Sequence, residues 1–258
     1  MNSIVVITTP GSQKRDFANE LTRRTKSVSL VVVQLPKKRP FLLRIKGFVR
    51  KVSLLHLPWE AMCFFLSRTK KNRALLQSVK SFTPFRRDQK EYVAQTIFVD
   101  DVNSDEVAEK IEAIRPKVIA IWGGMIVKDR VLRHADIAVN LHAGICPYYR
   151  GSNGNFHALL QGEKEKVGFT VHTAVPEVDA GDILSIIPGN PALSREAFFR
   201  DLNDKAAETY IRTIDRLLRG EKVERKKQDL MLGHNYLLRE WTYQKNYTLI
   251  RKVLSQWS

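Results

Sequence analysis

Residues 117–141 read KVIAIWGGMIVKDRVLRHADIAVNL and contain two short apolar runs, KVIAIW and DIAVNL. Each run is rich in Ile, Val and Ala and ends at Gly or at a polar residue, which is typical of a buried strand. Neither run alternates between apolar and polar positions. This pattern favours parallel strands that are covered on both faces, because such strands have no solvent-facing side.

Similar apolar runs recur along the chain, and helical patterns lie between several of them. We expect strands at 3–9, 28–35, 96–101, 117–124, 136–141, 167–175 and 182–188, and helices at 13–24, 105–114 and 194–220. Strands that alternate with helices predict an α/β fold with a doubly wound, mainly parallel sheet. Ligands bind outside the carboxyl ends of the strands in such sheets, so residues at these ends are candidates for a functional site.

The composition is that of a globular protein. A chain of 258 residues with 43% hydrophobic residues is long enough for one sizeable α/β domain. Two cysteines, Cys63 and Cys146, do not make a disulfide framework and fit a reducing compartment. The N-terminal stretch lacks the pattern of a signal peptide, and the longest apolar run in the middle of the chain, AMCFFL, is far shorter than a bilayer span. We therefore expect a cytoplasmic protein.

The net charge of +16 is concentrated in two segments. Residues 37–90 hold 15 Lys and Arg residues against two acidic residues, and 216–258 hold ten against four. Apolar residues at helical spacing in FLLRIKGFVRKVSLLHL predict that the first segment is an inserted basic helical subdomain. We expect a domain over 1–220 that includes this insertion at about 37–90, and a basic, irregular extension over 221–258.

The role of the insertion is open from the sequence. It is a solvated decoration, a site for an anionic substrate, a surface that lies on an anionic membrane, or the interface of a homodimer. Nucleic acid is not an expected partner, because the recognition motifs that would accompany such charge are missing.

Polar residues follow the second run of the opening stretch. The amide of Asn140 can donate to a developing oxyanion, and His142 can transfer protons near neutral pH. A carboxylate is needed to orient this imidazole. Asp179 is the best candidate and Asp182 is its competitor, both in the turn between the last two predicted strands. His172 lies inside a predicted strand, where a supporting role is expected, and Cys146 has no obvious base to make it a nucleophile.

Four stretches resemble the 10-formyltetrahydrofolate-dependent formyltransferases. They are IWGGMIV (121–127), NLHAGICPYYRG (140–151), GFTVHTA (168–174) and VDAGDIL (178–184). The resemblance extends over about 96–190 and includes the first strand loosely. It implies a Rossmann-like formyltransferase fold and an enzyme that moves a formyl group from 10-formyltetrahydrofolate to an amine, without a metal.

The resemblance also implies roles for individual residues. The catalytic trio would be Asn140, His142 and Asp179. The first two would stabilise the oxyanion of a tetrahedral intermediate, and the carboxylate would hold the imidazole and assist proton transfer. Residues expected to contact the folate are Gly123, Gly124, Met125, Ile126, Val127 and Asp182. Residues expected to contact the acceptor are Gly11, Ser12, Tyr149, Arg150, Ser152 and Asn153.

Two departures from the family pattern bear on the acceptor. Ala143-Gly144 replaces the Pro-Ser that often follows the histidine, and TTPGSQ replaces the glycine-rich turn of the glycinamide ribonucleotide enzymes. The final 38 residues are too short for the RNA-binding domain of methionyl-tRNA formyltransferase. An amino sugar, free or linked to a nucleotide, is therefore the expected small-molecule acceptor. The alternatives are a glycinamide ribonucleotide-type enzyme and a non-catalytic relative that binds RNA or an anionic membrane.

Overall fold

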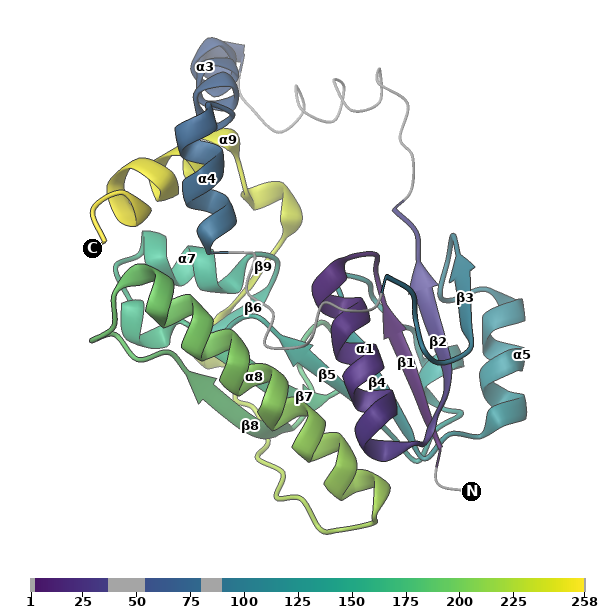
Figure 1. Ribbon diagram of the computed structural model, residues 1–258. Helices are drawn as coiled ribbons and strands as arrows, with labels where there is room; N and C mark the ends of the chain where they lie inside the picture. The colour runs from purple at the N-terminus through teal and green to yellow at the C-terminus, as the bar shows by residue number, and fades with distance from the viewer. Residues whose placement is uncertain (1–2, 37–53, 80–89, 258) are drawn as a thin grey trace.

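The central feature of the computed structural model is a seven-stranded sheet (Figure 1). The structure describes residues 3–36, 54–79 and 90–257. The strand order is β3-β2-β1-β4-β5-β7-β8. In chain order the strands are β1 (Ile4–Thr8), β2 (Val28–Gln34), β3 (Thr96–Val99), β4 (Val118–Trp122), β5 (Ile137–His142), β7 (Gly168–Thr173) and β8 (Ile183–Pro188).

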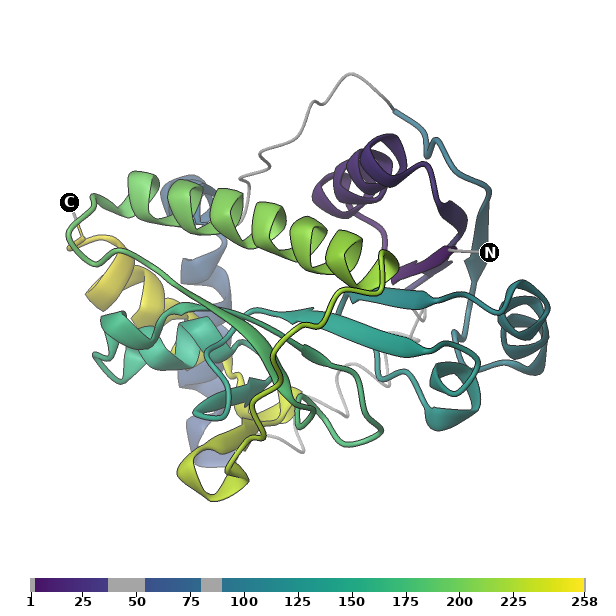
Figure 2. The same ribbon diagram turned by 90° about the horizontal axis from the view of Figure 1, so that it is seen from below.

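Strands β1 to β5 pair in parallel, whereas β7 runs antiparallel to both β5 and β8. Helices α1 (Ser12–Thr25) and α8 (Arg195–Leu218) cover one face of the sheet, and α5 (Asp105–Ile114) and α6 (Asp129–Leu132) cover the other (Figure 2). The predicted doubly wound, mainly parallel sheet is therefore confirmed. The antiparallel β7 and β8 follow from the short turn between them, which is too short for a parallel crossover.

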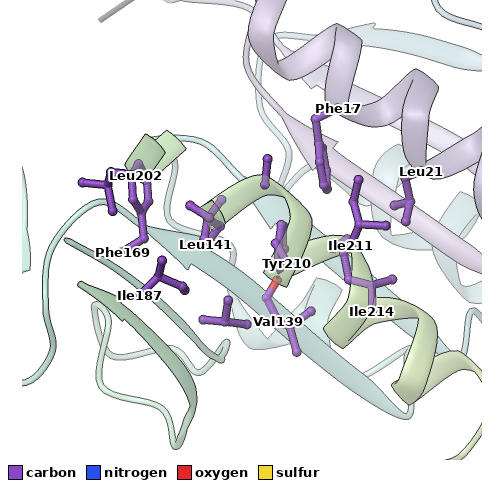
Figure 3. Packing of buried hydrophobic residues seen from close by; sticks show 14 of the residues in the cluster. Phe17, Leu21, Val139, Leu141, Phe169, Ile187, Leu202, Tyr210, Ile211 and Ile214 are labelled. Carbon is purple, nitrogen blue, oxygen red and sulfur yellow. Dashed lines mark hydrogen bonds between the residues drawn. The ribbon is translucent and has the colours of Figure 1, made fainter. Parts of the chain in front are cut away.

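Tyr210 of α8 joins the larger apolar core to the middle of the sheet (Figure 3). Its ring is fully buried and stacks on Phe17 of α1 with 5.2 Å between the ring centroids. Its hydroxyl lies 2.8 Å from the carbonyl oxygen of Ile121 and 2.9 Å from that of Val139. A buried hydroxyl needs such polar partners, so this contact fixes α8 against β4 and β5, the strands that lead into the site.

The insertion predicted at 37–90 is helical where the structure describes it. A short 3-10 helix (Leu54–His56) is followed by α3 (Leu57–Ser67) and α4 (Lys70–Ser78). The rest of the predicted insertion, at 37–53 and 80–89, lies outside the described residues. No described helix has the length and apolar character needed to cross a membrane.

The prediction of an irregular extension after residue 220 was wrong. Strand β9 (His234–Tyr236) pairs in parallel with β6 (Tyr149–Gly151), and α9 (Tyr243–Thr248) continues into a π-helical turn (Leu249–Leu254). These elements pack on α3 and on α7 (Gly154–Leu160). Tyr236, for example, stacks on His157 of α7 with 3.9 Å between ring centroids. Such short elements depend on tertiary contacts, which a local sequence pattern does not contain.

Candidate active site

The end of β5 and the turn after β7 bring the predicted catalytic trio together. Asn140 and His142 occupy alternate positions at the end of β5 and pair with β7. Asp179 lies in the β7–β8 turn with a left-handed φ of 48°. This turn is close-packed, because a Cβ atom added to Gly181 would lie 1.8 Å from the carbonyl oxygen of Thr173. Glycine at 181 therefore permits the approach that places the carboxylate beside β5.

The carboxylate of Asp179 lies at the centre of the polar contacts. Its Oδ2 atom lies 3.2 Å from Nδ1 of His142 and accepts the backbone N–H of Gly151 at 2.8 Å. Its Oδ1 atom accepts from the amide of Asn140 at 3.3 Å and lies 3.3 Å from Nε2 of His172. We call these four side chains, Asn140, His142, His172 and Asp179, the Asp179 centre. All three partner side chains come from β5 and β7, so the sheet itself sets the geometry.

His172 has a larger part in this arrangement than its position inside a strand indicated. Its Nδ1 atom lies 2.9 Å from the carbonyl oxygen of Thr173, and its Nε2 atom lies 3.1 Å from the Asn140 amide. The side chain is almost fully buried. It therefore contacts both Asn140 and Asp179 from the neighbouring strand.

His142 is held on both sides of its ring. Nδ1 faces Asp179, and Nε2 lies 2.7 Å from the carbonyl oxygen of Tyr149. Gly144 permits the second contact. A Cβ atom there would lie 2.2 Å from the same carbonyl oxygen and 2.6 Å from Nε2. The replacement of the family's Pro-Ser by Ala143-Gly144 thus has a structural consequence, because a serine at 144 does not fit beside this orientation of the imidazole.

The pKa values follow from burial and from these contacts. Burial by itself would raise the pKa of Asp179, but the neighbouring His142 and His172 and the Gly151 N–H lower it to about 2. Burial lowers the pKa of His142, although the Asp179 carboxylate acts in the opposite direction. The centre thus contains an ionised carboxylate at neutral pH, next to an imidazole whose charged form is disfavoured by burial and favoured by that carboxylate.

A cavity of about 620 Å³ opens beside the Asp179 centre and is lined by Asn140, His142 and Asp179. Its wall includes Gly123–Ile126 after β4 and Ser152 and Asn153 after β6. A smaller cavity of about 60 Å³ lies against Asn140, His172 and Asp179 and is lined by Met125, Ile126 and Val127. All the predicted folate contacts in the 123–127 turn therefore line one or both cavities.

Other predicted contacts lie outside both cavities. Tyr149 and Arg150 are buried, and Gly11 and Ser12 are exposed at the start of α1; none of the four lines either cavity. The hydroxyl of Tyr149 contacts Gln161 and Glu163 instead, and only its backbone carbonyl reaches His142. Asp182 lines neither cavity, and its carbonyl oxygen accepts the N–H of Thr173.

Three further residues or segments contribute to the site without a signal in the sequence. Lys14 of α1 lines the larger cavity, and burial lowers its pKa. Asn235 and Tyr236 of β9 form part of the wall of that cavity. Gln228 is buried and donates its amide N–H to the Asp179 carbonyl oxygen at 2.9 Å. The last two belong to the segment that we predicted to be irregular, which gave no signal of a role in the site.

Burial, above all, raises the pKa of the Cys146 thiol to about 12, so this group stays protonated at neutral pH and is a poor nucleophile. Among the described residues, no group of three or more His, Cys, Asp and Glu side chains is placed to hold a metal ion.

Known proteins with similar sequences are formyltransferases. The methionyl-tRNA formyltransferase of Finegoldia magna is 31% identical over 107 residues, which cover 41% of this chain and 34% of that protein. The one from Syntrophomonas wolfei is 28% identical over 153 residues, 57% of this chain and 48% of that protein. The chain thus spans about a third to a half of the length of these curated relatives.

Solved structures of formyltransferases share the fold. A sugar N-formyltransferase from a Shewanella species has a TM-score of 0.57 at 14% identity, and the match covers 92% of this chain and 78% of that one. At such identity the likeness shows the fold alone. The sequence model of the formyl transferase family matches residues 1–214, which include every element that carries the Asp179 centre. The chain therefore belongs to the formyl transferase family.

Proposed function

We propose that the protein transfers the formyl group of 10-formyltetrahydrofolate to the amine of an amino sugar, free or linked to a nucleotide. The observation that carries this proposal is the position of Asp179. Its carboxylate contacts both Asn140 and His142, and all three side chains line one cavity together with the 123–126 turn. An amide donor, an imidazole and a carboxylate that converge beside a cavity are the groups that acyl transfer to an amine requires.

In the proposed reaction the amine nitrogen attacks the formyl carbon, and the carbonyl oxygen becomes an oxyanion. Asn140 donates a hydrogen bond to that oxygen through an amide hydrogen that turns away from Asp179 or His172, its neighbours in the structure. His142 accepts the proton that the amine loses and passes it to the folate nitrogen as the bond from the formyl carbon to that nitrogen breaks. Asp179 keeps the imidazole oriented and stabilises its protonated form. For this step Nε2 of His142 turns from the Tyr149 carbonyl toward the reacting atoms.

The donor is assigned to the side of the centre where the 123–127 turn lies. Met125 and Ile126 line both cavities, and the smaller cavity extends behind Asn140 and Asp179. A formyl group bound between the two cavities would contact the side chains of both Asn140 and His142. The N-formyltransferase of Helicobacter canadensis, solved with folinic acid and dTDP-3-aminofucose, has a TM-score of 0.53 over 96% of this chain and 79% of that one, at 16% identity. Its folate ligand is consistent with this donor.

The acceptor is assigned to the larger cavity. Besides Asn140, four asparagine side chains line it, and these can form hydrogen bonds with sugar hydroxyls: Asn153, Asn155, Asn203 and Asn235. Among the described side chains, Oδ1 of Asn235 is buried without a hydrogen-bond partner. A ligand hydroxyl that donates to this oxygen would remove the free-energy cost of leaving a buried acceptor unpaired. Lys14 adds positive charge near the start of α1, which suits a phosphate-linked sugar.

The test measures tetrahydrofolate formation with 10-formyltetrahydrofolate and a panel of amines. The panel holds free amino sugars, nucleotide-linked amino sugars, glycinamide ribonucleotide and methionyl-tRNA. We expect turnover with an amino sugar, and a loss on the order of 100- to 1000-fold in Asn140→Ala and His142→Ala, because each removes a group that acts on the transition state. Asp182→Asn is the control, since its side chain lines neither cavity.

Two outcomes would contradict the proposal. Turnover with glycinamide ribonucleotide or methionyl-tRNA, and with no sugar, would keep the chemistry and replace the acceptor. Wild-type rates in Asn140→Ala and His142→Ala would exclude the proposed catalytic centre. Circular dichroism of each variant separates a chemical defect from unfolding.

A further inference from the structure

Helix α3 buries both of its polar side chains, Glu60 and Ser67. Glu60, Cys63 and Ser67 are buried, with exposed fractions of 3%, 0% and 7%. Phe65, on the opposite side, is 70% exposed, and Trp59, between the two sides, is 43% exposed. A helix of a soluble protein normally buries its large apolar side chains and exposes its polar ones. This reversal leaves a large apolar surface in contact with water.

The orientation of α3 is fixed by Glu60. Its Oε2 atom accepts the backbone N–H groups of Tyr243 at 2.8 Å and Gln244 at 3.2 Å, at the start of α9. Phe64 packs edge-on against the ring of Tyr243, with 4.8 Å between centroids. Because a buried carboxylate must keep its hydrogen bonds, α3 cannot rotate to bury its apolar side without breaking them. The apolar exposure is therefore built into the fold.

The exposed side chains form one continuous face. Leu55, Trp59, Met62 and Phe65 follow one another at intervals of three or four residues, so they lie on one side of the helical segment. We call these four residues the α3 face. Leu55 is 89% exposed and Met62 is 42% exposed. The helix has 11 residues, which corresponds to about 16 Å and is half of a bilayer core.

The charge around the α3 face is positive. The described stretch 54–79 contains four Lys and Arg residues, all exposed: Arg68, Lys70, Lys71 and Arg73. The only acidic residue of this stretch is Glu60, which is buried against α9. Arg68, just after α3, lies over the ring of Phe64 at 3.9 Å from its centroid, so one of these cations lies against the helix that carries the α3 face. An occupant of this face must be apolar and must carry negative charge beside its apolar part.

We propose that the α3 face docks on an anionic lipid bilayer, with α3 parallel to the membrane plane. Large apolar side chains, a tryptophan and flanking cations on a short helix match the requirements of interfacial binding. A second copy of the chain fits less well, because a two-fold interface would bring the same four cations of both copies together. The preceding segment 37–53 fits less well for the same reason, since it holds seven Lys and Arg residues and no acidic one.

This inference does not rest on the identity of the acceptor amine. The test is sedimentation of the full chain with vesicles of phosphatidylcholine alone and with vesicles that contain phosphatidylglycerol in equal share. We expect binding to the anionic vesicles that is at least about tenfold stronger than to the neutral ones and that weakens as salt is added. Phe65→Ser should reduce this binding about tenfold or more, because it removes the most exposed aromatic ring of α3.

The controls distinguish binding through the α3 face from nonspecific binding to vesicles. Phe98 is 59% exposed on β3, at the far edge of the sheet from α3 in Figure 1, so Phe98→Ser should bind like the wild type. Lys70→Glu/Lys71→Glu should lose the preference for anionic vesicles. Lys222→Glu/Arg225→Glu, which changes the net charge equally in an exposed segment after α8, should keep it.

Three results would overturn the proposal. The first is equal binding of the wild type to neutral and anionic vesicles, or binding to neither. The second is an equal loss in the two serine variants or in the two charge-reversal variants. The third is a wild-type dimer, by analytical ultracentrifugation, that Phe65→Ser converts to a monomer, since a second copy would then occupy the α3 face.

Discussion

Two carboxylates, the largely buried Asp179 and the buried Glu60, each connect distant segments, but their partners differ in kind. Asp179 contacts two imidazoles, one amide and one backbone N–H. Glu60 accepts from two backbone N–H groups of α9. Imidazoles gain and lose protons near neutral pH, whereas backbone N–H groups do not. His142, beside Asp179, can therefore take part in proton transfer, while the partners of Glu60 can only fix the position of α9.

The largest effect is expected from Asp179→Asn. The substitution keeps the size of the side chain but removes the negative charge that orients His142 and stabilises its protonated form. We expect kcat to fall on the order of 100-fold or more, in line with the role of a carboxylate behind a catalytic histidine. The measurement is the tetrahydrofolate assay with the best acceptor from the panel.

Glu60→Gln is the comparison for this variant, because it removes charge from the other buried carboxylate. It should leave kcat within about twofold of the wild type, since Glu60 lines neither cavity. If both variants lose activity to the same extent, the distinction between the two carboxylates is wrong. If neither does, Asp179 is not part of the reaction.

The α/β core was largely predictable from the sequence, because its strands are buried on both faces and read as unbroken apolar runs. The approach of Asn140, His142 and Asp179 was also predictable. The family motifs place all three at the carboxyl end of β5 and in the turn that faces it. Gly144 shows what the family motifs alone cannot predict. The change from the family pattern was visible, but its effect on His142 depends on the Tyr149 carbonyl, whose position no motif specifies.

The remainder could not be predicted because it depends on contacts between distant segments. Gln228 reaches the Asp179 turn from 49 residues away, and Asn235 enters the cavity wall through a three-residue strand. Neither segment has the length or periodicity that identifies an element in isolation. Which side of α3 is buried could not be predicted for the same reason. Helical spacing shows which residues share a side of a helix, and only the contact with α9 shows which side is buried.

The next effect in size is the acid sensitivity that Asp179 contributes. Its pKa falls from 3.8 to about 2 on folding, so its ionised form stabilises the native state above about pH 4. This contribution is lost as the pH falls from about 4 to about 2, and its size is about 2 kcal/mol. Urea unfolding of the wild type and of Asp179→Asn should show a gap in unfolding free energy that narrows by this amount between pH 5 and pH 2.

An Asp182→Asn control locates this effect in the Asp179 centre, because it alters a carboxylate of the same turn that lines neither cavity. The difference in unfolding free energy between Asp182→Asn and the wild type should change little over the same pH range. A gap between the wild type and Asp179→Asn that stays constant from pH 5 to pH 2 would mean that the imidazoles do not lower the pKa of Asp179 in the folded protein.

The smallest expected effect separates the charge of the Glu60 side chain from its role as a hydrogen-bond acceptor. Glu60→Gln keeps a carbonyl oxygen that can accept from Tyr243, so we expect it to lower the unfolding free energy by about 1 kcal/mol. Glu60→Ala leaves the N–H groups at the start of α9 without this acceptor and should lower it by about 2 to 3 kcal/mol. Both should speed proteolysis after residue 237, because α9 loses its attachment to α3. Glu224→Gln, an exposed carboxylate, should change neither property. If Glu60→Ala leaves stability and proteolysis unchanged, the contact with α9 does not hold α3 in its reversed orientation, and the α3 face is then free to turn inward.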